Sequence, residues 1–192
     1  MTCRAGFDRP LPPASQRGVV AVEFALISLF FFTLVLGIVE LGRVLYVWNT
    51  VQEVTRRAAR EAVVRSFVSE VSAVRREALF RPGTGTGSVV LPAAGEISNA
   101  EVRIMYLDGS MIEVSPAPSD PADNLSACAD AGRSSSCIRY VRAEVCDATT
   151  CQGVFYRPMI GFLLGAGGIN FRVRIPVSPV LMPAESLGFA PT

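Results

Sequence analysis

The residues that could do chemistry in this chain are five cysteines and one isolated glutamate. Histidine and lysine are absent, and all eighteen basic residues are arginines. Without histidine the chain has no imidazole general base and no histidine ligand for zinc. Without lysine it forms no Schiff base. The acids are scattered and the serines have no basic partner, so we expect no catalytic activity and no cofactor.

Four of the cysteines lie close together in the C-terminal half: Cys128, Cys137, Cys146 and Cys151. An even number of closely spaced cysteines in a small exported domain indicates disulfides. Of the three possible connectivities we favour the two local loops, Cys128 with Cys137 and Cys146 with Cys151. A zinc site built from the four thiolates is the alternative, but no C-x-x-C pair is present, and we expect no bound metal. Cys3 is expected to stay reduced in the cytoplasm.

The isolated glutamate is Glu23, which lies inside an apolar stretch. Residues 18–39 contain this one charge, and residues 24–39 contain none. About 20 apolar residues in a helix cross a hydrocarbon core of roughly 30 Å, so the stretch predicts a membrane-spanning helix. A carboxylate inside a span costs about 2.5–3.5 kcal/mol at the helix centre and usually serves a function. The alternative is that Glu23 lies near the membrane surface and only marks the start of the helix.

The flanks of the span predict its orientation. Arg4, Arg9 and Arg17 precede it with a single acid, Asp8. Arginines in front of a span favour a cytoplasmic N-terminus. Further arginines follow the span and weaken the asymmetry, whereas the expected disulfides support a C-terminal part outside the cytoplasm. A cleaved secretory signal is the alternative, but its apolar region is roughly 7–15 residues long and ends in a small-residue site that this chain lacks.

The stretch R-G-V-V-A-V-E-F-A-L, followed by L-G-I-V-E-L-G-R-V-L-Y, resembles the TadE-like proteins, minor pseudopilins of tight-adherence (Flp-type) pilus systems. The resemblance covers roughly residues 17–62. It implies that a membrane-embedded prepilin peptidase cuts after Gly18 on the cytoplasmic face, so that Val19 is the first mature residue. It also implies that Glu23, the fifth mature residue, and Phe24 act in assembly of the filament.

The spacing between Val19 and Glu23 agrees with this resemblance. Glu23 lies four residues after the new ammonium group at Val19, and therefore on the same helix face. In a filament, such a carboxylate can pair with the N-terminal amine of a neighbouring subunit, and a buried charge is tolerated only when it is paired.

The resemblance implies a function, partners and a location. The function is assembly, priming or anchoring of a tight-adherence pilus or a related secretion apparatus. The partners would be other pilins and pseudopilins, the inner-membrane assembly platform, prepilin peptidase and the membrane. The chain would be a single-pass protein of the bacterial inner membrane with a periplasmic C-terminal domain, with entry into the pilus as a further outcome. A net charge of +1 gives no electrostatic footprint for nucleic acid, which we exclude as a partner.

Two other functions compete with the pseudopilin. The first is a membrane-anchored periplasmic binding module whose anchor is not cleaved. The second is an anchored hydrolase, which the absence of histidine and lysine makes remote.

After the span, the sequence predicts an amphipathic stem helix. Residues 41–80 contain no proline and one glycine, Gly42, and apolar residues recur every three or four positions. The helix is continuous from the span to residue 80, or it breaks near Gly42 or around residues 66–72. The apolar stripe packs on the chain's own domain, which we favour, or on a partner helix. Its members are Val47, Val51, Val54, Ala58 and Ala62, followed by Val63, Phe67, Val71, Val74 and Ala78.

Beyond a glycine-rich linker or loop at residues 82–88, the pattern changes to alternation. Asp108-Gly109 between two alternating segments predicts a hairpin of residues 102–106 and 111–114. Residues 116–123 are expected to form a polar loop. Two further strands are expected at residues 138–146 and 171–177. The apolar stretch at residues 158–168 is too short to span a membrane, and either packs on the sheet or forms a patch for a partner.

These patterns predict an α+β protein, with a long N-terminal transmembrane and stem helix followed by a small antiparallel β-rich periplasmic domain with disulfides. The expected segments are a leader peptide at residues 1–18, a transmembrane helix at 19–48, a stem helix at 49–81 and the β-rich domain at 82–192.

Overall fold

The computed structural model describes residues 17–159 and 173–189. The chain divides into two units, Met1–Leu41 and Gly42–Thr192. The helix α1 (Arg17–Val64) begins in the first unit and ends in the second. No proline lies between Pro13 and Pro82, so the backbone hydrogen bonds of this helix are uninterrupted. A long apolar N-terminal helix followed by a small antiparallel β unit is the predicted α+β class.

The second half of α1 lies in the core of the second unit. The predicted stripe from Val47 to Ala62 is buried, with exposed fractions of 0–1%. It therefore packs on the chain's own domain, which is the alternative that we favoured. The stem expected at residues 49–81 and the β-rich domain expected at 82–192 share this core. Its larger cluster includes Val47, Val51, Val54, Ala58, Leu79, Leu91, Ile97, Val102, Ala143, Val145 and Tyr156.

The stem is two helices, because α1 ends at Val64 and a short helix, α2 (Val71–Ala78), follows. The break lies around residues 66–72, one of the two places expected. There the Ser66 hydroxyl oxygen accepts from the amides of Val68 at 3.4 Å and Ser69 at 3.5 Å. Serine side chains that bond to nearby amides compete with helical hydrogen bonds in this way. The stem expected at residues 49–81 is thus helical on both sides of this break.

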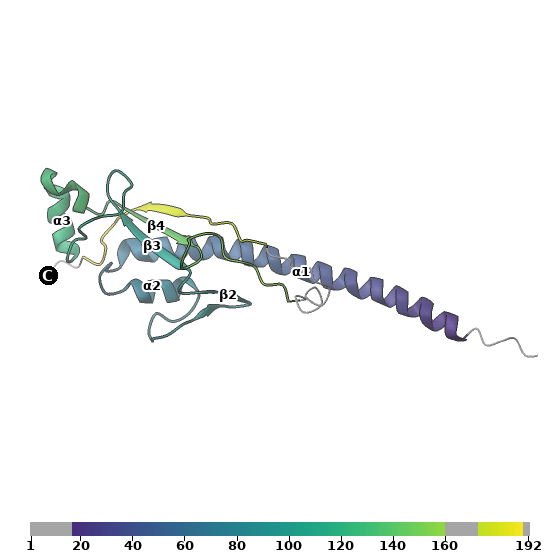
Figure 1. Cartoon of the computed structure of the whole chain (residues 1–192). Helices are drawn as coiled ribbons and strands as arrows, with labels where there is room; N and C mark the ends of the chain where they lie inside the picture. Colours follow the sequence, from purple (N-terminus) through teal and green to yellow (C-terminus); the bar gives the residue numbers. More distant parts are fainter. Residues whose placement is uncertain (1–16, 160–172, 190–192) are drawn as a thin grey trace, which may run out of the picture. The chain divides into compact units, whose positions relative to one another are not determined.

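Two antiparallel sheets complete the second unit (Figure 1). The first pairs β1 (Val90–Leu91) with β2 (Ala94–Ser98). The second has three strands in the order β3-β4-β5 and lies against the second half of α1. Its strands are β3 (Val102–Leu107), β4 (Tyr140–Val145) and β5 (Val180–Pro183).

The register of this sheet separates an inner face from an outer face. Ile104 pairs with Ala143, which in turn pairs with Val180, and these three point toward the helices. Met105 pairs with Arg142, which pairs with Leu181, and these three point away from them. Because side chains alternate along a strand, one face of the sheet is covered by α1 and α2 and the other faces outward.

The predicted hairpin after β3 forms in part. The Asp108-Gly109 turn forms, since the Asp108 amide donates to the Ile112 carbonyl at 2.8 Å. The returning segment pairs with the end of β3 through a 3.0 Å bond from the Val114 amide to the Tyr106 carbonyl and a bridge between Leu107 and Glu113, but it forms no full strand. The partner of β3 along its whole length is β4, which confirms the strand expected at residues 138–146.

Two further predictions need correction. The expected loop at residues 116–123 contains the start of α3 (Pro121–Ala129), which a 3-10 helix, η1 (Ala131–Ser136), follows. The last strand is β5 rather than residues 171–177, of which the described part, 173–177, makes one isolated bridge from Arg174 to Phe155. Cys3, the leader up to residue 16, residues 160–168 of the apolar stretch and residues 171–172 lie outside the described residues.

Candidate functional site

The first half of α1 presents apolar side chains on all of its faces. Every large apolar residue from Val19 to Leu41 is exposed, from 36% at Val35 to 72% at Phe30. The most apolar 18-residue window has a mean hydropathy of 2.6, and none of it is buried by the chain itself. A helix that is apolar all round requires lipid or other helices as its cover. This half of α1 is long and apolar enough to be a single membrane anchor.

The residues expected at the processing site lie at the start of this helix. Gly18 is helical, and a methyl group placed on its Cα would meet nothing within 4 Å. Val19 is 59% exposed and Phe24 is 71% exposed. A protease or a neighbouring helix could therefore reach these residues without displacing any other described part of the chain.

Glu23 lies on the same face of α1 as Val19, one helical turn later. Its side chain is exposed, and among the described residues it has no hydrogen-bond or ion-pair partner. The residues around it on the helix are apolar, so a membrane would leave the carboxylate without water. A charge in such surroundings is tolerated only when it is paired.

Arg43, the arginine of the E-L-G-R motif, attaches the second half of α1 to the loops of the second unit. Its guanidinium forms a 3.2 Å ion pair with Glu96 on β2 and donates to the Arg157 carbonyl at 2.6 Å. It also lies 4.8 Å from the centre of the Tyr156 ring. The side chains are 15% exposed for Arg43 and 3% for Glu96, so this is a largely buried pair. Sequence reasoning missed it, because no local pattern links Arg43 to an acid fifty-three residues later.

The structure pairs the four cysteines as disulfides in the expected connectivity. Cys128 on α3 is bonded to Cys137, which precedes β4, and Cys146 at the end of β4 is bonded to Cys151. The Cα atoms of the two pairs are 4.7 Å and 4.6 Å apart. Both bridges close short loops at the ends of the same strand.

Glu144 lies beside the second disulfide and, within the described part of the chain, is the acid whose ligand atoms cluster with it. Its carboxylate is 3.1 Å from the Cys151 sulfur, and ligand atoms of Glu144, Cys146 and Cys151 lie within 4.8 Å of one another. The two sulfurs are bonded to each other in the disulfide, however, and Glu144 forms a 2.8 Å ion pair with Arg142. The two sulfurs therefore form a cross-link and are not thiolate ligands, and Arg142 balances the charge of the Glu144 carboxylate.

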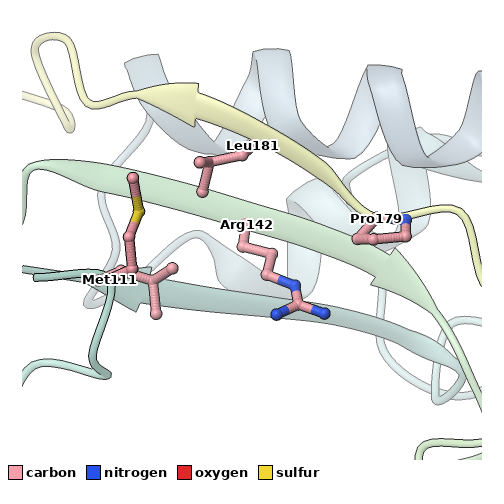
Figure 2. Close-up of a pocket in the computed structure, with 5 residues that line it drawn as sticks. Met111, Arg142, Pro179 and Leu181 are labelled. Atoms are coloured by element: carbon pink, nitrogen blue, oxygen red, sulfur yellow. The ribbon is translucent and has the colours of Figure 1, made fainter.

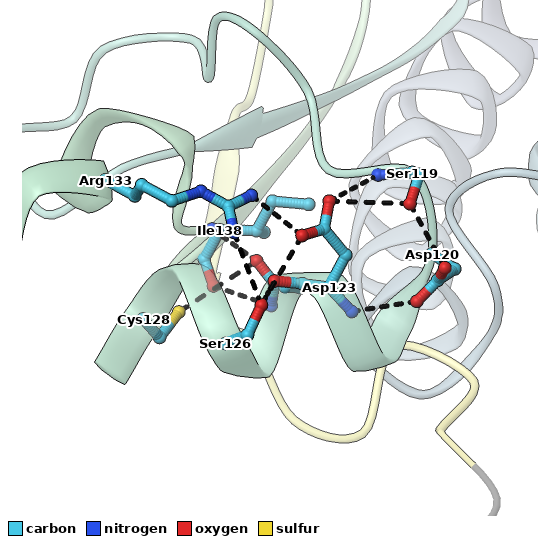
Figure 3. A network of polar contacts seen from close by, with 8 residues as sticks. Ser119, Asp120, Asp123, Ser126, Cys128, Arg133 and Ile138 are labelled. Carbon is cyan, nitrogen blue, oxygen red and sulfur yellow. Dashed lines mark hydrogen bonds and ion pairs between the residues drawn. The ribbon is translucent and has the colours of Figure 1, made fainter. Parts of the chain in front are cut away.

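A polar network positions α3 and its disulfide (Figure 3). Asp120 caps the helix, since its carboxylate accepts from the Asp123 amide at 2.8 Å. Asp123 in turn accepts from the Ser119 amide and the Arg133 guanidinium, and these bonds hold the pKa of its carboxyl below the usual range. Asn124 accepts from the Ile138 amide at 2.8 Å, which joins α3 to the segment entering β4.

Two other groups in the second unit have shifted pKa values. Burial raises the pKa of the Tyr106 phenol to about 12, against a smaller opposing effect of Arg75. Hydrogen bonds from the Thr149 hydroxyl and the amides of Thr150 and Thr149 lower the pKa of Asp147 to about 2. Neither group is part of a nucleophile and base pair, and both stabilise local structure.

The outer face of the three-stranded sheet has a shallow hollow of about 400 Å³ (Figure 2). Met111, Pro179 and Leu181 lie around the Arg142 side chain there. Met111 is 48% exposed and Leu181 is 45% exposed. The described lining of the hollow is three aliphatic or thioether side chains, one proline and one arginine.

The fold and the exposed helix define a class: a protein with a single apolar N-terminal helix and a small disulfide-bonded α+β unit. The model of the TadE-like protein family matches residues 18–60. This confirms the resemblance over the first helix and its continuation, and it supports a role in tight-adherence pilus systems with pilus components as partners. No curated protein and no solved structure matches the chain.

Proposed function

We propose that the chain is a minor pseudopilin that acts in assembly, priming or anchoring of a tight-adherence pilus or a related secretion apparatus. The single observation behind the proposal is the first half of α1, which is apolar on all faces, uncovered by the chain itself, and contains one charge, Glu23, up to residue 39. The TadE-like match, at residues 18–60, includes this segment.

In this proposal, the first half of α1 lies in the inner membrane with a cytoplasmic N-terminus and the second unit in the periplasm. Prepilin peptidase removes residues 1–18, and Val19 then provides a free ammonium group. Glu23 pairs with the corresponding amine of a neighbouring pilin or pseudopilin, while the apolar helix faces pack together. The inner-membrane assembly platform then binds the processed helix. No catalytic step is assigned to the chain, which has no histidine or lysine.

The test of processing is the mass of the mature chain in cells with and without prepilin peptidase. A Gly18→Leu variant should keep the leader, whereas the control Gly37→Leu should lose it normally. The control is matched, because a Cβ at either glycine would meet nothing within 4 Å. An intact N-terminus in the unaltered chain, with peptidase present, would contradict the proposal and favour the uncleaved binding module.

The test of assembly is a pair of substitutions of exposed glutamates on α1. Glu23→Leu should leave membrane insertion intact and abolish co-purification with partner pilins. Glu53→Leu, on the part of α1 that belongs to the second unit, should affect neither. Normal pilus assembly with Glu23→Leu would remove the role given to this carboxylate.

The second candidate, an uncleaved anchored binding module, is favoured by the hollow around Arg142 on the outer face of the sheet. In that case the hollow would bind its partner, and the processing experiment separates the two functions.

A further inference from the structure

A small apolar cavity lies in the second unit beside the first turns that α1 makes there. Its volume is about 210 Å³. Val44 and Trp48 line it from α1, and Tyr156, Arg174 and Ile175 line it from the two segments that bridge at Phe155 and Arg174. Trp48 is 43% exposed. The cavity thus has apolar walls, an aromatic rim and one cation at its edge.

The charged side chain that lines this cavity is Arg174, and Arg157 follows the lining residue Tyr156 in the sequence. Arg157 and Arg174 are exposed, and neither forms an ion pair with any described residue. Arg174 lies 4.2 Å from the centre of the Phe155 ring and donates to the Gly153 carbonyl, which holds its guanidinium at the surface. In the sequence, residues 148–184 contain three arginines and no acid. Glu96 on β2 is paired with Arg43, and Glu40 lies on α1 one helical turn before Val44.

The position of the cavity along α1 sets what can reach it. Val44 and Trp48 follow the uncovered apolar half of the helix by three and seven residues, about 5–10 Å at 1.5 Å per residue. Tyr46 and Trp48, both partly exposed, are the aromatic types enriched where a span leaves the hydrocarbon core. If the first half of α1 spans the bilayer, as in the proposed function on which this inference rests, Val44 and Trp48 lie on α1 where the helix passes the lipid headgroups.

We propose that this face binds an anionic phospholipid from the adjacent leaflet. The upper part of an acyl chain enters the cavity against Trp48 and Ile175, and the phosphate lies between Arg157 and Arg174. Guanidinium groups bind phosphate oxygens through charge-assisted hydrogen bonds. A cation at a membrane surface contributes about 1 kcal/mol of attraction to anionic lipid. The second unit would then be held against the membrane at a second point besides its helix.

The experiment uses the fluorescence of Trp48, the only tryptophan of the chain. The full-length protein is reconstituted in vesicles of phosphatidylcholine with phosphatidylglycerol, and one or the other lipid has bromine atoms near the headgroup end of its acyl chain. Bromine quenches tryptophan on contact. We expect stronger quenching by brominated phosphatidylglycerol than by the same fraction of brominated phosphatidylcholine.

Two double variants test whether Arg157 and Arg174 cause the preference for phosphatidylglycerol. Arg157→Gln with Arg174→Gln should lower the preference for phosphatidylglycerol roughly fivefold per arginine, the equivalent of about 1 kcal/mol each. Arg60→Gln with Arg103→Gln removes the same charge from exposed positions of the same unit and should leave the preference unchanged. Resistance to protease confirms that each variant is folded.

The outcomes separate this inference from the proposed function. If the chain does not float with the vesicles in alkaline carbonate, the membrane anchor is wrong and the lipid site falls with it. Equal quenching by both brominated lipids in an integrated chain, or equal losses in the two double variants, overturns the lipid site alone. Absence of quenching by either lipid also overturns it, and would indicate that the cavity is filled by protein, such as the apolar sequence of residues 160–171.

Discussion

The two halves of α1 contain the same kinds of apolar side chain, but these are exposed in the first half and buried in the second. Val22 in the first half is 59% exposed, whereas Val51 and Val54 in the second half are at most 1% exposed. The charge pattern distinguishes them. Residues 18–39 have one charge, so every face is apolar, whereas residues 53–61 alternate acids and arginines around an apolar stripe. A stripe is covered by the chain's own domain, and a helix that is apolar all round is left for lipid or for partners.

This difference implies that the two halves contribute to different equilibria. Burial of the second half stabilises the second unit, because its apolar surface leaves water when that unit folds. The first half buries nothing within the described chain, so its apolar surface is available for membrane insertion and association. Substitutions in the two halves should therefore separate folding of the second unit from assembly.

The largest effect is expected from a charge in the buried stripe. Val54→Asp places a carboxylate in the core formed by α1 and the sheet, which should cost more than about 4 kcal/mol and unfold the second unit. Limited proteolysis of the full chain in detergent measures this. Phe30→Ala, a large truncation at a 72% exposed site, should leave the protease resistance of the second unit unchanged.

Val68→Asp is the control for added charge, since Val68 is 59% exposed in the turn between α1 and α2. If Val54→Asp remained as resistant as Val68→Asp, α1 would not form the core of the second unit, and the contrast between the two halves would be lost.

The next largest effect is expected at Arg43, which fixes the start of the buried half. Arg43→Ala leaves the Glu96 carboxylate buried without its cation and should destabilise the second unit by about 3 kcal/mol. Replacing both residues, as Arg43→Met with Glu96→Leu, should restore part of this loss because no charge is then left unpaired. The denaturant midpoint of the second unit in detergent measures both. A double variant as unstable as the single one would show that the loss is due to packing of Arg43.

Elements with local signals were predicted well from the sequence. The stripe from Val47 to Ala62 and the alternation of β4 depend on the spacing of apolar residues, and both could be recognised without knowledge of the partner. The exposed first half was equally clear, as was the resemblance that the family match confirmed. Local spacing also suggested the two short disulfide loops.

The failures came from contacts that are distant in sequence. The turn after β3 was predicted from its local signal, whereas the pairing of β3 with β4 along its whole length has no local signal. The Arg43–Glu96 pair and the hollow around Arg142 likewise join residues that are distant in sequence. The helix α3 was missed for another reason, since Asp120 followed by Pro121 is a recognisable helix start that the proline-rich composition obscured.

A smaller effect is expected from the disulfides, which only the second unit has among the described residues. Loss of the bridge in Cys128→Ser with Cys137→Ser should lower the free energy of unfolding by about 2–3 kcal/mol. Loss of the shorter bridge, in Cys146→Ser with Cys151→Ser, should cost slightly less, because the sequence separation is 5 rather than 9. Cys3→Ser, in the expected leader, is the control and should not change denaturant unfolding. An unchanged midpoint in both double variants would show that the α+β core alone stabilises the unit.

The smallest expected effect is an acid-sensitive loop in the second unit. The Asp147 carboxylate accepts hydrogen bonds from Thr149 and Thr150, which place its pKa at about 2 in the folded chain, below the ordinary value of 3.8. Since the folded pKa is lowered, the unfolded state binds the proton first. The stabilisation is therefore complete above pH 3.8 and is lost as the pH falls through about 2.

The amide signals of Thr149 and Thr150 should titrate with a midpoint near 2, and Asp147→Asn should abolish the titration. The amides of residues 28–34 lie at least five residues from the nearest acids, Glu23 and Glu40, and should not follow it. A common midpoint in both regions would mean that acid acts on the whole chain, whereas a titration confined to the loop would show that the second unit depends on polar contacts that the exposed half of α1 does not share.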